Sequence, residues 1–289
     1  MRLLAPFALA LCLVLLVPAA AGARVSVGIG DQHASSYRDP GLRKLHLKTA
    51  RLSLAWDWYK DPYLTAQADA WVAAVRSARM RPLISLNRSW RPSGRYEIPA
   101  MADYVRSFRL LRARYPHVRE FSAWNEPNAT EQPFYRKPKL AARYFNAMRR
   151  AAGRRITVVA GDIKDGRAMT AWLRTYKRKV HGAKIWALHN YKDATSKYTR
   201  GTTRAFVRIV HRPVWLTETG GIRSRGGLTG QARSVKRIFK LARASHAIKR
   251  IYFYEWRAVR HSHWDSAFLS ATGKHRPAYH ALRQGLRHR

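Results

Sequence analysis

The sequence contains very little cysteine and very little acid. Its single cysteine, Cys12, lies in an apolar N-terminal segment, so residues 24–289 have neither disulfide bonds nor thiol chemistry. Asp and Glu together number 16, against 56 Lys and Arg, which gives a formal net charge of +40. Beyond the N-terminus no apolar run approaches the ~20 residues that a bilayer-spanning helix needs. These absences exclude a disulfide-stapled scaffold and a multi-span membrane protein.

The first 23 residues have the pattern of a secretory signal peptide. A positive start at Met1-Arg2 precedes an almost wholly apolar run over Leu3–Val17, which Pro18 interrupts. Small residues at Ala21-Gly22-Ala23 then supply a cleavage site. We expect cleavage after Ala23, secretion of the chain and no stable membrane insertion of the remainder. The alternative is an uncleaved anchor, since Leu3–Ala23 is just long enough to span a bilayer.

The excess of positive charge has two interpretations. A field of this strength favours anionic partners such as acidic polysaccharide, anionic cell wall, a membrane surface or nucleic acid. In the second interpretation, the many arginines reflect the overall composition of the sequence and only keep the surfaces of the outer helices hydrated. The basic residues are spread along nearly every predicted helix, and the sequence has none of the signatures of the common nucleic-acid modules. We therefore expect no specific nucleic-acid partner.

Short apolar, β-rich segments alternate with amphipathic helical segments from residue 25 to the end of the chain. Eight strands, each followed by a helix, imply a parallel sheet with right-handed connections. The predicted strands are Val25–Gly30, Ala50–Ala55, Leu83–Asn87, Phe121–Asn125, Ile156–Gly161, Ile185–His189, Val214–Thr217 and Ile251–Tyr254. The predicted helices are Ala66–Met80, Met101–Tyr115, Lys139–Arg154, Arg167–Val180, Thr202–Val210, Gln231–Ser245 and Ala278–Leu286, with a less regular one between Ser35 and Lys48.

Two architectures accommodate this pattern, a closed barrel and an open doubly wound sheet. Eight strands, and a length for residues 24–289 close to the ~250 residues typical of TIM barrels, favour one (β/α)8 barrel domain over that range. An open sheet that binds a dinucleotide needs a glycine-rich loop after its first strand. Gly28-Ile29-Gly30 lacks the third glycine, so this fingerprint fails.

Six of the 16 acidic residues follow the ends of predicted strands, where the active site of a TIM barrel is found. They are Glu126, Glu218 and Glu255 after strands four, seven and eight, and Asp31, Asp57 and Asp162 after strands one, two and five. Taken alone, Asp57, Asp162 and Glu255 are expected to form structural salt bridges with the abundant arginine. A facing pair of carboxyl groups has another use, because glycosidic bond cleavage needs one acid to protonate the leaving oxygen and one carboxylate to attack or activate water.

Two motifs identify the pair. Trp124-Asn125-Glu126-Pro127-Asn128 and Leu216-Thr217-Glu218-Thr219-Gly220 resemble the catalytic motifs of the clan A glycoside hydrolases, families 5 and 39 in particular. The resemblance implies that Glu126, ending strand four, is the acid/base and that Glu218, ending strand seven, is the nucleophile of a retaining enzyme. The two motifs occur in the expected order along the chain.

The same resemblance covers nearly the whole of residues 24–289 and assigns further residues. It implies that Arg51 lies beneath the nucleophile and that Tyr191, in His189-Asn190-Tyr191, hydrogen-bonds it. It also implies that Trp256 forms the floor of the sugar-binding subsite. His189 is expected to orient its neighbours rather than to carry a proton. Asn125 is expected to bond the sugar 2-hydroxyl, a contact that strengthens in the transition state.

Electrostatics agrees with these assignments. Arg51 and Tyr191 are expected to keep Glu218 ionised, because a cation and a hydrogen-bond donor both stabilise a carboxylate. The negative Glu218 is in turn expected to keep Glu126 protonated for its first task. An exposed indole also suits the apolar face of a pyranose ring, so Trp90, just after the third strand, is a further candidate sugar contact.

Three hypotheses follow. The first is a retaining glycosidase that acts on an oligo- or polysaccharide, with an acidic glycan as one option, and that needs no metal or organic cofactor. The second is a non-catalytic secreted binder of anionic cell-wall or matrix polysaccharide on a barrel scaffold, since a fold does not fix a function. The third is a basic nucleic-acid binder, whose affinity would fall steeply with salt. The paired glutamates favour the first.

Overall fold

The structure is a computed structural model that describes residues 24–195, 201–260, 262 and 264–287. Residues 1–23, over which the signal peptide is predicted, lie outside the described residues, so that prediction is not tested by the structure. None of the described helices combines enough length with enough apolar character to cross a bilayer.

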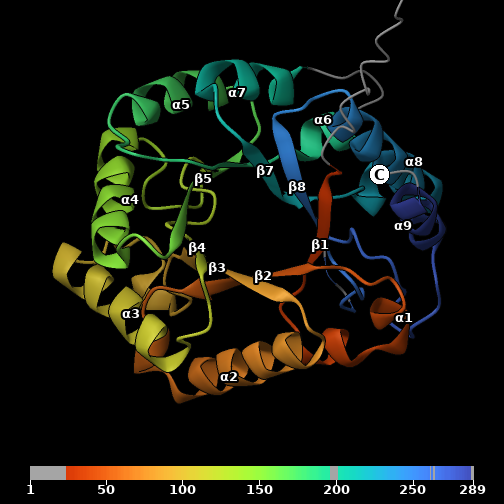
Figure 1. Ribbon diagram of the computed structural model, residues 1–289, viewed down its shortest axis with the longest axis horizontal. Helices are drawn as coiled ribbons and strands as arrows, with labels where there is room; N and C mark the ends of the chain where they lie inside the picture. The colour runs from red at the N-terminus through yellow and green to blue at the C-terminus, as the bar shows by residue number, and fades with distance from the viewer. Residues whose placement is uncertain (1–23, 196–200, 261, 263, 288–289) are drawn as a thin grey trace, which may run out of the picture.

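Eight parallel strands close into a barrel, in which each strand pairs with the next along the chain and the last pairs with the first (Figure 1). This closure confirms the predicted (β/α)8 barrel and excludes the open sheet. Because all strands are parallel, their carboxyl ends meet at one face, where TIM barrels carry their active sites. The strands are β1 (Ser26–Gly30), β2 (Thr49–Ala55), β3 (Arg81–Asn87), β4 (Glu120–Ser122), β5 (Thr157–Lys164), β6 (Trp186–His189), β7 (Val214–Thr219) and β8 (Ile248–Tyr254).

Helices surround the barrel between successive strands (Figure 1). The long helices are α2 (Pro62–Ser77), α3 (Met101–Arg114), α4 (Pro138–Ala152), α5 (Met169–Lys177), α7 (Thr202–Val210), α8 (Gly227–Arg243) and α9 (Pro277–Arg287). The other helical elements of the described residues are two short helices, α1 (Pro40–Arg43) and α6 (Tyr191–Thr195), and four 3₁₀ turns, η1 (Ala34–Arg38), η2 (Trp58–Lys60), η3 (Pro92–Gly94) and η4 (Arg223–Arg225).

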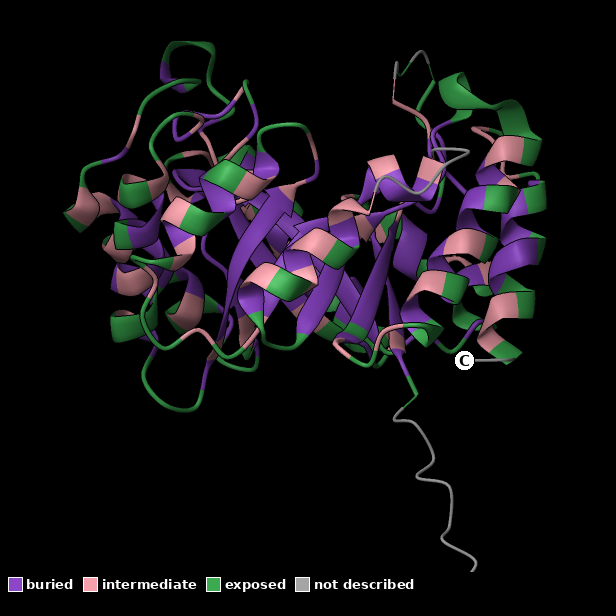
Figure 2. Cartoon of the chain, turned by 90° about the horizontal axis from the view of Figure 1, so that it is seen from above, coloured by how far each residue is buried: buried purple, intermediate pink, exposed green. Residues whose placement is uncertain are grey.

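Helix α2 illustrates how local sequence sets these elements. The Asp61 carboxylate accepts hydrogen bonds from the N–H groups of Tyr63 and Leu64, at 2.9 and 3.3 Å, and Pro62 occupies the first helical position. Apolar residues then recur every three or four positions and form the buried face of the helix: Leu64, Ala68, Trp71, Val72 and Val75. Figure 2 shows the result, buried strands inside a ring of helices whose outer faces are exposed.

The barrel interior changes character along its axis. Near the amino ends of the strands, Trp215 and Tyr252 belong to a buried apolar cluster. The Arg250 guanidinium lies 3.7 Å from the centre of the Trp215 ring and forms an ion pair with Glu120. Near the carboxyl ends the interior is polar and charged, around Arg51. The packed lower half therefore supports a polar upper half that opens toward the loops.

Several predicted boundaries differ from the structure by a few residues, and three of these differences affect the first helix and the strands that carry the site. The expected helix between Ser35 and Lys48 is two short turns, η1 and α1, because Pro40 disfavours a helical backbone at Asp39, which has φ −64° and ψ 125°. Strand β4 ends at Ser122 rather than Asn125. Strand β5 continues to Lys164 instead of ending at Gly161, through a register shift against β6.

Candidate active site

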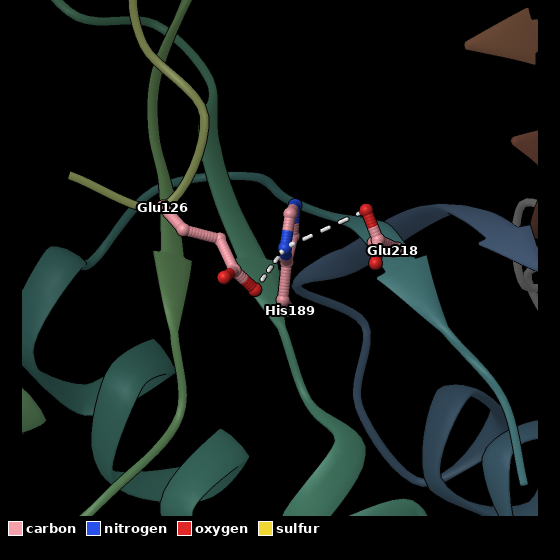
Figure 3. A group of neighbouring side chains, drawn as sticks. All are labelled: Glu126, His189 and Glu218. Carbon is pink, nitrogen blue, oxygen red and sulfur yellow. Dashed lines mark hydrogen bonds and ion pairs between the residues drawn. The ribbon is translucent and has the colours of Figure 1, made fainter. Parts of the chain in front are cut away.

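Three side chains from different strand ends meet above the barrel (Figure 3). Glu126 follows β4, His189 ends β6 and Glu218 lies near the end of β7. His189 Nδ1 lies 2.9 Å from Glu126 Oε1 and 3.8 Å from Glu218 Oε2, so the imidazole stands between the two carboxylates. One oxygen of Glu126 and one of Glu218 lie within 4.8 Å of each other. The structure thus brings together the two glutamates that the sequence motifs singled out.

Backbone hydrogen bonds from two neighbouring strands position Glu126. The Asn125 N–H donates to the Leu86 carbonyl at 2.7 Å, and the Glu126 N–H donates to the Asp162 carbonyl at 3.0 Å. Glu126 has a φ of 44°, in the left-handed region that few residues other than glycine adopt. Such a conformation costs about 1–3 kcal/mol and persists only where the surroundings fix it. The Asn-Glu-Pro segment is therefore held in a bent conformation that turns Glu126 toward the barrel axis.

Two donors fix both oxygens of Glu218. Arg51 Nη1 donates to Oε2 at 3.0 Å, and the Tyr191 hydroxyl donates to Oε1 at 2.9 Å. Burial and the charge of Glu218 raise the pKa of Tyr191 well above its usual range, so the tyrosine remains a neutral donor. A cation and a hydroxyl donor together stabilise the ionised carboxylate. These are the two contacts that the resemblance implied for Arg51 and Tyr191.

Asp162 anchors Arg51 from below. Its carboxylate accepts from Arg51 Nη2 at 2.8 Å, from Ser85 Oγ at 2.6 Å and from Thr217 Oγ1 at 2.7 Å. Burial alone would raise the Asp162 pKa, but Arg51, His189 and these donors lower it to about 2. The expected salt bridge between Asp162 and an arginine is confirmed. Because Asp162 fixes Arg51, it positions the guanidinium beneath Glu218.

The protonation of His189 depends on its two acidic neighbours. The side chain is fully buried, and burial by itself lowers the histidine pKa. The charge of Glu218 and the hydrogen bond with Glu126 outweigh burial, so the His189 pKa lies above its ordinary value. The imidazole therefore takes up a proton more readily than a free histidine, and its Nδ1 is in hydrogen-bonding contact with Glu126. The expected orienting role of His189 stays a prediction.

Lys164 is a site residue that sequence reasoning missed. Its Nζ lies 3.6 Å from Glu126 Oε2 and 3.0 Å from Glu131 Oε1. Burial lowers the lysine pKa, but the charges of Glu126 and Glu131 raise it above its usual range, so Lys164 stays cationic. Lys164 follows a β5 irregularity in which Gly161 and Asp162 have φ of 113° and 55°. The alternation that indicates inward-facing positions breaks there, so no sequence signal marked Lys164.

Only the oxygen of the Asn125 amide has a hydrogen-bond partner among the described residues. Its Oδ1 accepts from Arg51 Nη2 at 2.6 Å, and this contact orients the side chain. Its Nδ2 makes no hydrogen bond to any described residue, and the residue is partly exposed. A free amide N–H beside Glu126 is available to a hydroxyl group of a bound ligand, as the sequence motif predicts.

The structure corrects the role predicted for Trp256. Its side chain is 0% exposed and packs against Phe268 and Tyr279, at ring separations of 6.3 and 5.9 Å. A ring covered on all sides does not contact a sugar, so Trp256 is a packing residue. The aromatic ring at the end of β8 that borders the site is Tyr254, which is partly exposed. Burial and the charges of Glu255 and Glu218 raise its pKa well above the usual range.

Trp90 is the one candidate tryptophan that remains available. It is 43% exposed on the loop after β3, whereas Trp56 and Trp58, also near strand ends, are buried. Its proposed contact with a sugar stays a prediction.

The remaining strand-end acids have separate environments. Asp57 accepts from Ser89 Oγ at 2.7 Å and lies 3.7 Å from Arg91 Nε, as expected for a structural acid. Glu255 is 4% exposed and forms no salt bridge with any described residue, so the salt bridge predicted for it is wrong. Burial and the charges of Asp31 and Asp265 raise the Glu255 pKa to about 8. Glu255 is therefore largely a neutral carboxylic acid at pH 7.

Among the described residues, one group has ligand atoms close enough together for a metal ion, namely Glu126, His189 and Glu218. Both carboxylates already face fixed cations, however. Lys164 lies 3.6 Å from Glu126, and Arg51 lies 3.0 Å from Glu218. Two positive charges at this range repel a further cation. The donor set suits proton transfer between carboxyl groups better than metal coordination.

Comparison with known proteins adds a family. Residues 109–281, more than half of the chain, match the family described as "Glycosyl hydrolase catalytic core". No curated protein sequence matches the chain.

Solved structures share the fold at low sequence identity. A family 39 glycoside hydrolase from Bacteroides cellulosilyticus WH2 superposes with a TM-score of 0.66 and 16% identity, over 90% of this chain and 63% of that one. A GH5_18 variant from Streptomyces cattleya, in complex with Manb1-4GlcNAc, gives a TM-score of 0.70 and 13% identity, over 91% and 80%. A monomeric beta-xylosidase from Caulobacter crescentus CB15 gives 0.65 and 14%, over 90% and 67%. The chain thus spans less than two thirds of the length of the first of these proteins.

Proposed function

The chain belongs to the glycosyl hydrolase catalytic core family, and from that premise we propose that it is a retaining glycosidase with Glu218 as nucleophile and Glu126 as acid/base. One observation carries the proposal. An oxygen of Glu126 and an oxygen of Glu218 lie within 4.8 Å of each other, with the His189 imidazole between them. Inverting enzymes need a separation of about 6.5–9.5 Å to admit a water molecule, whereas retaining enzymes need about 5–5.5 Å. The short separation supports direct attack by a carboxylate.

In the first step, a Glu218 oxygen attacks the anomeric carbon while Glu126 delivers a proton to the leaving oxygen. The C–O bond to the leaving group breaks, and an ester bond to Glu218 forms. Arg51 and Tyr191 hydrogen-bond both oxygens of Glu218 and so orient it for this attack. The proton comes from Glu126, which His189 Nδ1 contacts at 2.9 Å and Lys164 Nζ at 3.6 Å.

In the second step, water attacks the same carbon from the side that the leaving group vacated. Glu126, now a carboxylate, accepts a proton from the water, and the ester bond to Glu218 breaks. The product therefore keeps the anomeric configuration of the substrate. Lys164 Nζ and His189 Nδ1 lie 3.6 and 2.9 Å from the Glu126 oxygens and can hold this carboxyl group in place. Glu126 is then protonated again and ready for the next cycle.

The substrate is an oligo- or polysaccharide. Asn125 Nδ2 is available to the sugar 2-hydroxyl, and the rings of Tyr254 and Trp90 are available to the apolar faces of sugars. We further propose that the protein is secreted, on the pattern of an apolar run and small-residue cleavage site before residue 24.

The direct test is a screen of aryl glycosides of different sugars, followed by variants assayed on the best substrate. Glu218→Gln should lower kcat by at least ~1000-fold, because losing a nucleophile removes the covalent route. Glu126→Gln should lower kcat strongly only for substrates with poor leaving groups, since good ones need no proton. Glu97→Gln, an exposed glutamate on the loop before α3, is the matched control and should retain full activity. A wild-type rate in Glu218→Gln would make the nucleophile assignment wrong.

A further inference from the structure

A cavity with three arginine side chains lies between α6 and α8, the helices that follow β6 and β7. It has a volume of about 350 Å³ and lies between α6, the loop after β7 and the first turns of α8. Arg225, Arg233 and Arg237 line it together with the Ser234 hydroxyl and the Thr195 side chain. None of its lining residues is acidic. The cavity therefore concentrates positive charge in a concave surface, which an isolated exposed arginine does not do.

The charge in this cavity is not compensated within the described part of the chain. Arg237 Nη1 donates to the Ala194 carbonyl at 2.7 Å, which holds the guanidinium in place without neutralising it. Arg225 and Arg233 make no ion pair with any described carboxylate. By contrast, the nearby Arg223, outside the cavity, lies 3.7 Å from Asp265. The chain thus pairs the arginine next to the cavity and leaves those inside it available.

Two segments of the chain, α6 and the loop after β7, connect the surroundings of the nucleophile with the cavity. Tyr191, whose hydroxyl bonds Glu218, begins α6, and Thr195 ends the same five-residue helix and lines the cavity. At 1.5 Å per residue, this helix spans only about 6 Å. On the other side, Ile222 follows the end of β7 closely and also lines the cavity. The chain segments that carry Glu218 and Tyr191 therefore reach the cavity within a few residues.

We propose that this cavity binds an anionic group, a carboxylate or a sulfate, on a sugar unit of the polysaccharide substrate. The planar guanidinium presents paired N–H groups that match the oxygens of such anions, and two or three forks together hold one anion more firmly than a single surface charge. The inference rests on the proposed glycosidase function and narrows its substrate class to acidic glycans. It also assigns a role to part of the large positive charge.

Binding is measured with probes that differ in charge alone. For the carboxylate, the charged probe is a polygalacturonate oligosaccharide and its neutral partner is the methyl ester. For the sulfate, the charged probe is a carrageenan oligosaccharide and its neutral partner is the desulfated form. Each is titrated by calorimetry, at one ionic strength, into Glu218→Gln protein so that nothing is hydrolysed. The arginine variant adds Arg225→Gln and Arg233→Gln. The control adds Lys240→Gln and Arg243→Gln, which remove the same two charges from the far end of α8.

We expect at least one anionic probe to bind five- to tenfold more tightly than its neutral partner. The arginine variant should lose that preference, and the control variant should keep it. Equal affinity for charged and neutral partners in both pairs would overturn the proposal, as would an equal loss in both variants, which would indicate a general charge effect. Hydrolysis of aryl glycosides by the wild type is recorded separately. A preference for anions without hydrolysis would support this binding site and contradict the proposed glycosidase function. Hydrolysis without a preference for anions would support the glycosidase function and contradict this binding site.

Discussion

His189 Nδ1 lies 2.9 Å from Glu126 Oε1, and the imidazole has no water-exposed surface. The two groups are therefore close enough to exchange a proton directly. Lys164 Nζ lies 3.6 Å from the other Glu126 oxygen, and the charge of Glu218 together with the Glu126 contact raises the pKa of His189. A proton that moves between His189 and Glu126 during catalysis would use this contact.

This arrangement predicts a specific pH effect of His189→Gln. Glutamine keeps a hydrogen bond to Glu126 but cannot take up a proton as histidine can. The alkaline limb of kcat/KM for an aryl glycoside with a poor leaving group should therefore move to lower pH by a unit or more. In the wild type that limb should lie above the ordinary histidine value, because the His189 pKa is raised.

The leaving group supplies the control for this experiment. A dinitrophenyl glycoside departs without protonation, so its alkaline limb should be the same in His189→Gln and in the wild type. An unchanged limb for the poor leaving group would show that the imidazole only orients Glu126.

Asp162→Asn should destabilise the fold and lower activity together. The change leaves the buried Arg51 with one anionic partner instead of two, and breaking a buried ion pair costs about 3–5 kcal/mol. Urea denaturation measures this cost. The exposed pair of Asp69 and Arg114 is the matched control, for which Asp69→Asn should cost less than about 1 kcal/mol. Similar losses of unfolding free energy in the two variants would contradict the claim that Asp162 stabilises the buried Arg51.

Variants of Tyr254, at the end of β8, and of Trp256, just after it, distinguish a sugar-binding residue from a packing residue. Tyr254→Ala should raise KM for oligosaccharides, because its ring borders the space above Glu218. Trp256→Leu should lower the free energy of unfolding by roughly 2–4 kcal/mol, since it leaves a void between Phe268 and Tyr279. KM should stay near the wild-type value in Trp256→Leu. The reverse pattern, with KM sensitive to Trp256 alone, would restore the role that the sequence had suggested.

Glu255 predicts how stability depends on pH. Its folded pKa of about 8 exceeds the ~4.3 of an unfolded glutamate. The folded state therefore binds this proton more tightly, and the contribution of Glu255 to stability is complete below ~4.3 and is lost as pH rises to about 8. Glu255→Gln should abolish this loss and gain a few kcal/mol at pH 8. Denaturation midpoints of the variant and wild type that run parallel from pH 5 to 8 would rule this out.

Most of the fold was predictable because it follows from repetition. Eight apolar segments separated by amphipathic helices indicate parallel strands, and the closed order follows from the count. The boundaries were wrong where a single residue overrides the pattern. Pro40 divides the expected first helix, and the left-handed backbone at Gly161 and Asp162 extends β5 beyond its apolar run. Such local conformations depend on contacts with other strands, which periodicity does not record.

The site could be predicted where a sequence motif identifies both a functional residue and the strand end on which it lies. Glu126 and Glu218 converge because each ends a strand at the same face, and Arg51 reaches Glu218 from β2. The tryptophan at position 256 was misplaced because β8 ends at Tyr254, and the chain beyond it turns into the packing against α9. Lys164 carried no motif at all, since its function depends on a distance to Glu126 across an irregular strand.

The most direct measurement is the anomeric configuration of the first product, followed by proton NMR on whichever aryl glycoside or oligosaccharide the enzyme cleaves. Attack by Glu218 followed by attack of water at the same carbon involves two inversions. The account therefore predicts a first-formed sugar with the configuration of the substrate, before mutarotation. A first-formed sugar of the opposite configuration would mean that water attacks directly, and it would contradict the assignment of Glu218 as nucleophile.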